Sequence, residues 1–230
     1  MTTPRFEPRP TGSASDLAAR MGDALPGAES FTAEQAALVD VVRRLLDGVV
    51  VTDVDDAERV RLTAELERIV DDLGARTRDP LIRLVRHSDG RFENLTQAGT
   101  GRANPRAIPV AFDDLTVGPA ITAGPGPEVR GHCVLGAAAG GPPERAHGGV
   151  VAALLDESLG AALVAAGRLG MTVALEVDYL AGVPLGVPLE LRSRCTGVEG
   201  RKTRLSAEIV VDGSVVARGR ALFVASRPDA

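Results

Sequence analysis

Apolar residues recur at helical spacing in two stretches near the start of the chain. In the first, Thr32 and Gln35 have the spacing of a capping box, and the apolar pattern that follows predicts a helix ending at Gly48. The second covers residues 55–73 and has an acidic first turn, which suits the positive end of a helix dipole; Gly74 ends it. We therefore predict a helical N-terminal extension over residues 31–75.

Two stretches beside this extension lack a steady period. Residues 1–30 are rich in Pro, Gly, Ser and Ala, which is typical of a mobile arm. Residues 76–108 are polar and contain several turn signals, with one short strand expected near residues 81–85. A structureless loop of that length is unusual inside a compact domain, so we interpret it as a linker.

From residue 109 onward the pattern predicts strands on both sides of one long helix. Three short strands are expected at 110–112, 120–122 and 129–135, and the helix at 147–166. Strands follow at 172–179, 189–196, 204–211 and 214–225, and Asp212-Gly213 separates the last two as a hairpin turn. Strands gathered around a single helix indicate an α+β domain over residues 109–230, not a parallel sheet.

Two of these strands alternate cleanly. Within 172–179, the odd positions Val173 to Tyr179 are apolar, and Thr172 shares the opposite side with the even positions. Within 189–196, Leu189, Leu191, Ser193 and Cys195 alternate with charged or polar residues. Each strand should therefore have one face on the core.

Composition narrows the classes of protein. The 230 residues are 44% apolar but only 3% aromatic, so Val, Leu and Ala must fill the core. A net charge of −5 argues against non-specific nucleic-acid binding. Two distant cysteines form no disulfide framework, and no apolar stretch reaches the roughly 20 residues that span a bilayer. With no secretory signal at the start, we expect a cytoplasmic protein without a membrane span.

The main candidate functional residues lie on the helix predicted at 147–166. It is apolar almost all round, so the sheet should enclose it. Gly148 and Gly149 leave the first amides uncovered at the positive end of the helix, where a carbonyl oxygen gaining negative charge would bind. Asp156 lies in the middle, where a carboxylate is costly unless it is paired. Alternatively, Asp156 and Glu157 form an exposed strip, and His147 is only a helix-start or packing residue.

Helix geometry separates these groups within one chain. His147 and Asp156 are nine positions apart, which corresponds to about 13 Å along a helix and roughly half a turn. They cannot meet on one small substrate unless two helices contribute. Since the sequence offers one such helix, we expect a homodimer with two equivalent interface sites.

At this point the sequence resembles a known family. His147-Gly148-Gly149, followed by Asp156 nine residues after the histidine, is similar to the hotdog-fold acyl-CoA thioesterases of the PaaI-like branch. Residues 170–179 and 198–202 resemble strands of the human THEM-type thioesterases. The resemblance covers about residues 115–225. It implies an antiparallel sheet wrapped around the helix, assembly into a homodimer or a dimer of dimers, and an acyl-CoA substrate.

The resemblance also implies roles for individual residues. Asp156 would be the general base or nucleophile, Gly148 the oxyanion donor, and His147 a neighbour of the thioester carbonyl. Thr172 would hold the attacking water or the aspartate. The implied substrate-binding positions are Gly149, Asp178, Leu180, Arg201 and Lys202. Leu180 departs from the basic residue that some relatives have there, which weakens the CoA assignment on that strand.

No metal or other cofactor is expected, because His87, His132 and His147 are scattered and no metal-ligand spacing occurs. The serine-hydrolase elbow Gly-x-Ser-x-Gly is absent from the sequence. A non-catalytic acyl-CoA-binding protein is the main alternative to an acyl-CoA thioesterase. A hotdog dehydratase is a third, but its closely spaced Asp and His are not found. The N-terminal helices are expected to pack on the hotdog domain and to affect the oligomeric state.

Overall fold

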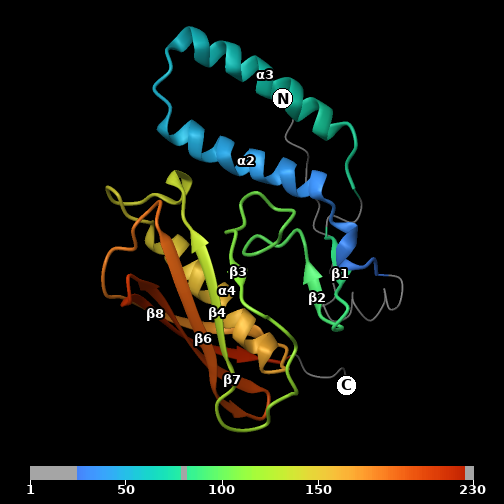
Figure 1. The fold of residues 1–230 in the computed structure, drawn as a ribbon, viewed down its shortest axis with the longest axis vertical. Helices are drawn as coiled ribbons and strands as arrows, with labels where there is room; N and C mark the ends of the chain where they lie inside the picture. Colours follow the sequence, from blue (N-terminus) through green and yellow to red (C-terminus); the bar gives the residue numbers. More distant parts are fainter. Residues whose placement is uncertain (1–24, 79–81, 226–230) are drawn as a thin grey trace.

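A six-stranded antiparallel sheet curves around one long helix, α4 (Gly148–Ala165), in the computed structural model (Figure 1). The structure describes residues 25–78 and 82–225. The strands lie in the order β3-β4-β6-β7-β8-β5. Their bounds are Ala111–Phe112 (β3), Glu128–Val134 (β4), Met171–Tyr179 (β5), Pro188–Glu199 (β6), Lys202–Val211 (β7) and Ser214–Val224 (β8). The α+β fold class is confirmed.

Alternation places one face of the sheet on the core. In β6, Leu189, Leu191, Ser193 and Cys195 are all buried, as the sequence pattern predicts. The hairpin between β7 and β8 also follows the prediction. Asp212 and Gly213 both have positive φ, 47° and 78°, as a tight two-residue turn requires. The short strand expected at 120–122 does not form.

A β-bulge interrupts the alternation of β5. Thr172 pairs with Phe223, but Ala174 pairs with Leu222, so Val173 is an extra residue between two successive pairs. Phe223 is buried, and the bulge therefore places Thr172 on the inner face of the sheet. The prediction that Thr172 shares a face with Ala174 is wrong for this reason.

Helix α4 lies in the concave side of the sheet, and much of the domain core forms along it. Val151, Leu154, Leu155, Leu159 and Ala162 are almost completely buried. Among the described residues, α4 is the one helix long and apolar enough to cross a bilayer by length and composition alone, and half of that stretch is buried. The core helix of a folded domain passes the same test.

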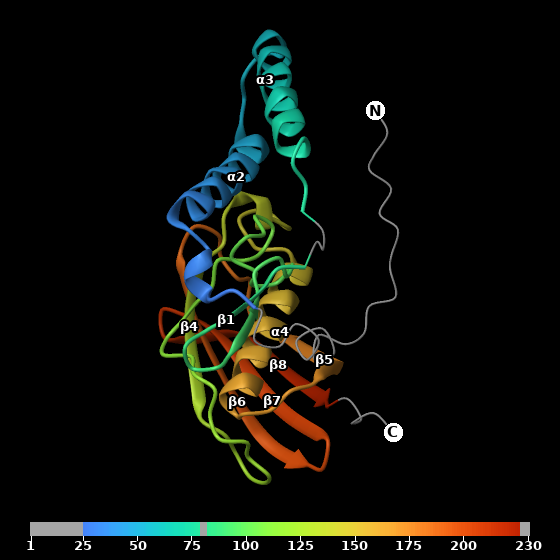
Figure 2. The ribbon, with the colours of Figure 1, turned by 90° about the vertical axis from the view of Figure 1, so that its right-hand side faces the viewer.

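The N-terminal extension forms two helices, α2 (Ala33–Val51) and α3 (Asp56–Gly74). The capping box between Thr32 and Gln35 is present, and Asp55 caps α3 through the Glu58 amide. Gly48 does not end α2, which continues for three more residues. The strongest contact of α2 is with the short helix η3 (Ala137–Ala139), whereas α3 buries no residue and stands away from the sheet (Figures 1 and 2).

The stretch expected to be a linker is folded for much of its length. Strands β1 (Leu84–Arg86) and β2 (Phe92–Asn94) form a hairpin. Val85 and Leu95 are fully buried and Ala107 nearly so, and none of the three belongs to the core cluster around α4. Residues 1–24, most of the predicted arm, lie outside the described residues, and Ala28–Ser30 form the short helix η2.

Candidate active site

The start of α4 is capped by His147. Its Nδ1 accepts a hydrogen bond from the Gly149 amide at 3.0 Å, and its carbonyl oxygen accepts from the amides of Val150 and Val151. Within the part of the chain that the structure describes, the Gly148 amide has no acceptor. The glycine pair therefore offers one free N–H group, at Gly148, at the positive end of the helix.

The same cap sets the proton position on the histidine ring. Because Nδ1 of His147 accepts a hydrogen bond, the neutral ring carries its proton on Nε2. The side chain is exposed, and the backbone N–H of His147 donates to the Ala139 carbonyl at 2.8 Å. His147 can therefore cap the helix through Nδ1 and still donate a hydrogen bond to a ligand through its Nε2–H.

Asp156 lies two turns further along α4, on the side that faces β5. Its Oδ1 accepts a hydrogen bond from Thr172 Oγ1 at 2.9 Å. The residue is partly buried. The contact depends on the bulge at Val173, because an uninterrupted strand would turn Thr172 to the outer face. Thr172 leaves the second oxygen of Asp156 available to take a proton or to attack an electrophile.

The two groups do not meet within one chain. Gly148 and Asp156 are eight helical residues apart, which is about 12 Å along the axis. One chain therefore holds a free N–H group at the start of α4 and a carboxylate about two turns further on, and the two groups are too far apart to contact one small molecule.

Strand β5 is the open edge of the sheet. Several large apolar side chains at or beside it are more than half exposed, and these are Leu169, Met171, Val173, Tyr179 and Leu180. The opposite edge, β3, is only two residues long. A long apolar edge with free backbone groups is a site for pairing with another strand.

Four of the five implied substrate-binding residues, all except Gly149 in the first turn of α4, fall into two groups at opposite ends of β5. Arg201 and Lys202 begin β7 at the Thr172 end of the sheet, and Arg201 Nη1 donates to the Ala225 carbonyl at 2.8 Å. Asp178 and Leu180 lie at the other end. Asp178 Oδ2 pairs with Arg220 Nη1 at 2.9 Å, and the Leu180 side chain is 52% exposed. Within one chain, the structure does not bring these groups together.

One residue that sequence reasoning assigned no role contacts the glycine turn. Tyr179 Oη donates to the Gly148 carbonyl at 3.0 Å, and its ring lies against Gly148. Tyr179 is the single tyrosine of the chain. In the sequence, Tyr179 ends an apolar strand, a position that indicates packing. No short-range pattern connects it to Gly148, which lies 31 positions earlier.

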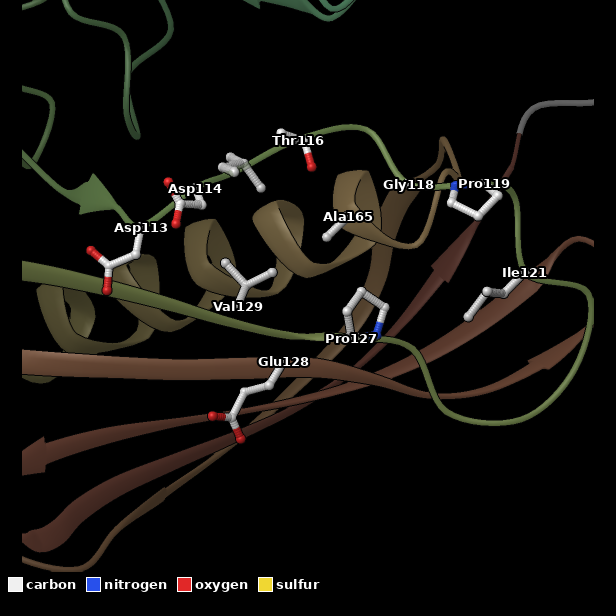
Figure 3. A pocket seen from close by; sticks show the side chains of 11 residues that line it. Asp113, Asp114, Thr116, Gly118, Pro119, Ile121, Pro127, Glu128, Val129 and Ala165 are labelled. Carbon is white, nitrogen blue, oxygen red and sulfur yellow. The ribbon is translucent and has the colours of Figure 1, made fainter.

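Two cavities of the described residues lie away from His147 and Asp156. One of about 210 Å³ opens between the C-terminal end of α4 and β4, where Asp113, Asp114 and Glu128 meet apolar residues (Figure 3). Another, of about 320 Å³, lies on the charged outer face of the sheet and includes Arg194 and Arg218. Neither is lined by His147 or Asp156. The described residues contain no cluster of three or more His, Cys, Asp or Glu side chains suited to a metal ion.

Comparison with known proteins agrees with this architecture. Residues 144–224, which contain α4 and the four strands after it, match the family model described as the thioesterase superfamily. A solved thioesterase superfamily protein is 32% identical, with a TM-score of 0.71, and the match covers 86% of this chain and 97% of that one. This chain belongs to the thioesterase superfamily. The hotdog arrangement implied by the sequence resemblance is therefore confirmed.

Two named proteins are also similar to parts of this chain. Acyl-coenzyme A thioesterase THEM4 of Xenopus laevis is 39% identical over 69 residues, which is 30% of this chain but only 31% of that relative's length. The PaaI protein of E. coli is 17% identical, with a TM-score of 0.43, and the match covers 50% of this chain and 82% of that one.

Proposed function

We propose that this chain is an acyl-CoA thioesterase whose two active sites lie at the interface of a homodimer. Membership of the thioesterase superfamily and the similarity to an acyl-CoA thioesterase support the reaction class. The observation that carries the proposal is the placement of two hydrogen bonds at the ends of β5. Thr172 binds Asp156 at one end, and Tyr179 binds Gly148 at the other.

Pairing of two β5 edges would join these ends. A twofold axis through an edge strand pairs it with itself in antiparallel orientation, so the start of one strand lies beside the end of the other. Thr172 and Asp156 of one subunit would then lie near Tyr179 and Gly148 of the partner subunit. Each dimer would hold two complete sites, and each subunit would give the carboxylate to one site and the amide to the other.

The residues suit hydrolysis of a thioester. The Gly148 N–H and the Nε2–H of His147 of the partner subunit donate to the thioester carbonyl oxygen as it gains negative charge. Asp156 either removes a proton from water that attacks the carbonyl carbon, or attacks that carbon directly. The C–S bond then breaks, and the CoA thiolate takes up a proton. On the first route, the oxygen of the attacking water stays with the acyl group, which leaves as a carboxylic acid. On the second route, the acyl group remains on Asp156 as a mixed anhydride until a water molecule hydrolyses it to the acid and restores the carboxylate. Thr172 holds Asp156 in orientation throughout.

The same dimer would gather the implied substrate-binding residues. Antiparallel pairing brings Arg201 and Lys202 of one subunit to the side of the interface where Asp178 and Leu180 of the partner subunit lie. Lys202 has no ion-pair partner among the described residues, and its ammonium group suits a CoA phosphate. Asp178 is held by Arg220, which leaves it better placed to orient that arginine than to contact an anion.

Replacement of the carboxylate tests the reaction. Asp156→Asn removes the base while Thr172 can still donate to the amide oxygen, so the fold and the dimer should persist. We expect thiol release from a panel of short, long and aromatic acyl-CoAs, followed with a thiol reagent, to fall by about 10²–10⁴-fold. Asp72→Asn, on the exposed face of α3, is the matched control. Saturable acyl-CoA binding by the parent chain without thiol release would instead favour the non-catalytic binder.

Complementation tests the shared site. Gly148→Pro removes the free N–H, and the site tolerates proline, because it is the first helical position and His147 before it has φ −64° and ψ 136°. Homodimers of Gly148→Pro and of Asp156→Asn should both be nearly inactive. Mixed dimers have one intact site, so random reassortment of the two variants should restore about a quarter of the parent rate. A mixture as inactive as its components, despite proven subunit exchange, would contradict the shared site.

A further inference from the structure

The N-terminal extension contacts the segment that holds His147. Asp47, near the end of α2, accepts a hydrogen bond through Oδ1 from the Ala138 amide at 2.8 Å. Its carboxylate lies against Gly136, where an added Cβ would clash with it. Ala138 belongs to η3, and the carbonyl of the next residue, Ala139, accepts the backbone N–H of His147 at 2.8 Å. The short helix η3 therefore connects the Asp47 carboxylate of α2 to His147, the residue that caps the start of α4.

A second contact reaches the helix turn that carries Asp156. The neighbouring Glu157 accepts a hydrogen bond from Thr100 Oγ1 at 3.2 Å, and Gln97 Nε2 lies 3.4 and 3.5 Å from its two carboxylate oxygens. Gly99 completes this cradle, because a Cβ there would overlap the Glu157 carboxylate. Burial raises the pKa of Glu157, the charge of Asp156 adds to the rise, and the Thr100 hydrogen bond opposes it.

Both contacts come from one connected unit. Arg83, just before β1, donates to Gln35 Oε1 of α2 at 3.0 Å, and Arg43 of α2 donates to the Asn104 carbonyl at 3.3 Å. The Ile108 amide donates to the Gly99 carbonyl at 3.0 Å and so fixes the cradle to the start of the hotdog domain. Helix α2 is thus connected by hydrogen bonds both to η3 and to the segment that forms the cradle.

We propose that the N-terminal extension and the folded segment at 84–107 together form a scaffold of the active site, in which Asp47 and Glu157 are positioning residues for the two halves. The inference rests on the proposed function. Its physical reason is that a displacement of about 1 Å at a reacting group can cost 10²-fold in rate. The similar solved structure supports an integral extension, because its match covers 86% of this chain, whereas residues 109–230 are only 122 of 230 residues.

Kinetics of point variants in the full chain test the two contacts. We expect Asp47→Ala and Glu157→Ala each to lower kcat about tenfold with little change of KM, because the groups act on geometry and not on substrate. Asp47→Asn and Glu157→Gln keep an acceptor for Ala138 and Thr100 and should recover most of the rate. Thr100→Val, a milder change at the cradle, should lower kcat in the same direction. Asp72→Asn serves again as the control and should match the parent.

Amide hydrogen exchange makes the test independent of activity. Asp47→Ala should speed exchange at His147 and the first amides of α4, and Glu157→Ala at residues 97–101, with the core strands unchanged. Exchange at these sites equal to the parent in both variants, or kcat within twofold of the parent in both, would overturn the scaffold. A parent chain that hydrolyses no acyl-CoA would refute the proposed function, while the exchange measurement would still decide whether the extension holds the two segments.

Discussion

At the scale of single residues, the start of α4 combines a cap and a binding group within three positions. His147 satisfies the amides of Gly149, Val150 and Val151, which leaves the Gly148 N–H as the one free donor of the turn. Tyr179 fixes the carbonyl of the same glycine from the neighbouring strand. A glycine turn has little resistance of its own to reorientation, so these contacts decide where the free N–H points.

Loss of the tyrosine hydroxyl should weaken the oxyanion end without removing it. In Tyr179→Phe the ring keeps its contact with Gly148, but the hydrogen bond to the Gly148 carbonyl is lost. A hydrogen bond of this kind contributes ~1 kcal/mol, so we expect kcat to fall about fivefold at constant KM. Steady-state kinetics on one acyl-CoA would show this. A parent-like kcat in Tyr179→Phe would assign the residue to packing alone.

At the scale of helices and strands, sequence patterns predicted the elements whose formation depends on residues close together in the chain. Caps and alternation gave both N-terminal helices, α4 and the strands of the central sheet, because these features depend on residues a few positions apart. The bulge at Val173 escaped prediction because it depends on pairing with β8, and the cradle around Glu157 because it joins residues about 60 positions apart. Of the hairpin at 84–94, the sequence indicated only a short strand near residues 81–85, and the second strand was missed because it is only three residues long.

The continuation of α2 past Gly48 leads to a stability prediction. Gly48 is exposed, and an added Cβ would meet nothing within 4 Å. Alanine loses less backbone entropy in a helix, so Gly48→Ala should raise the free energy of unfolding by about 0.5–1 kcal/mol in urea titrations. Gly213→Ala is the contrasting variant. It forces a side chain on a residue with φ of 78° and should destabilise by about 1–2 kcal/mol. A destabilised Gly48→Ala would mean that α2 does end near this glycine.

At the scale of the whole molecule, one chain keeps the proposed catalytic groups apart and leaves the β5 edge of its sheet unpaired. The edge that is open is the one whose two ends hold Asp156 and Gly148, through Thr172 and Tyr179. In the dimer that we propose, the same strand would provide the subunit contact and would connect the two half-sites. Subunit association and catalysis would then depend on the same residues.

A charge placed on the β5 edge should abolish dimerisation and thioesterase activity together. Val173 is 58% exposed at the bulge, and Val173→Lys would place two ammonium groups in the paired interface, where they must lose water without a partner. We expect light scattering to report a monomer, and thiol release to fall to the level of Asp156→Asn, while circular dichroism stays that of the parent. Val60→Lys is the control, since Val60 is 71% exposed and belongs to α3, the helix that stands away from the sheet in Figure 1. A monomeric Val173→Lys with the parent rate would show that one subunit carries a complete site. A dimer that survives this variant with full activity would place the interface on another surface.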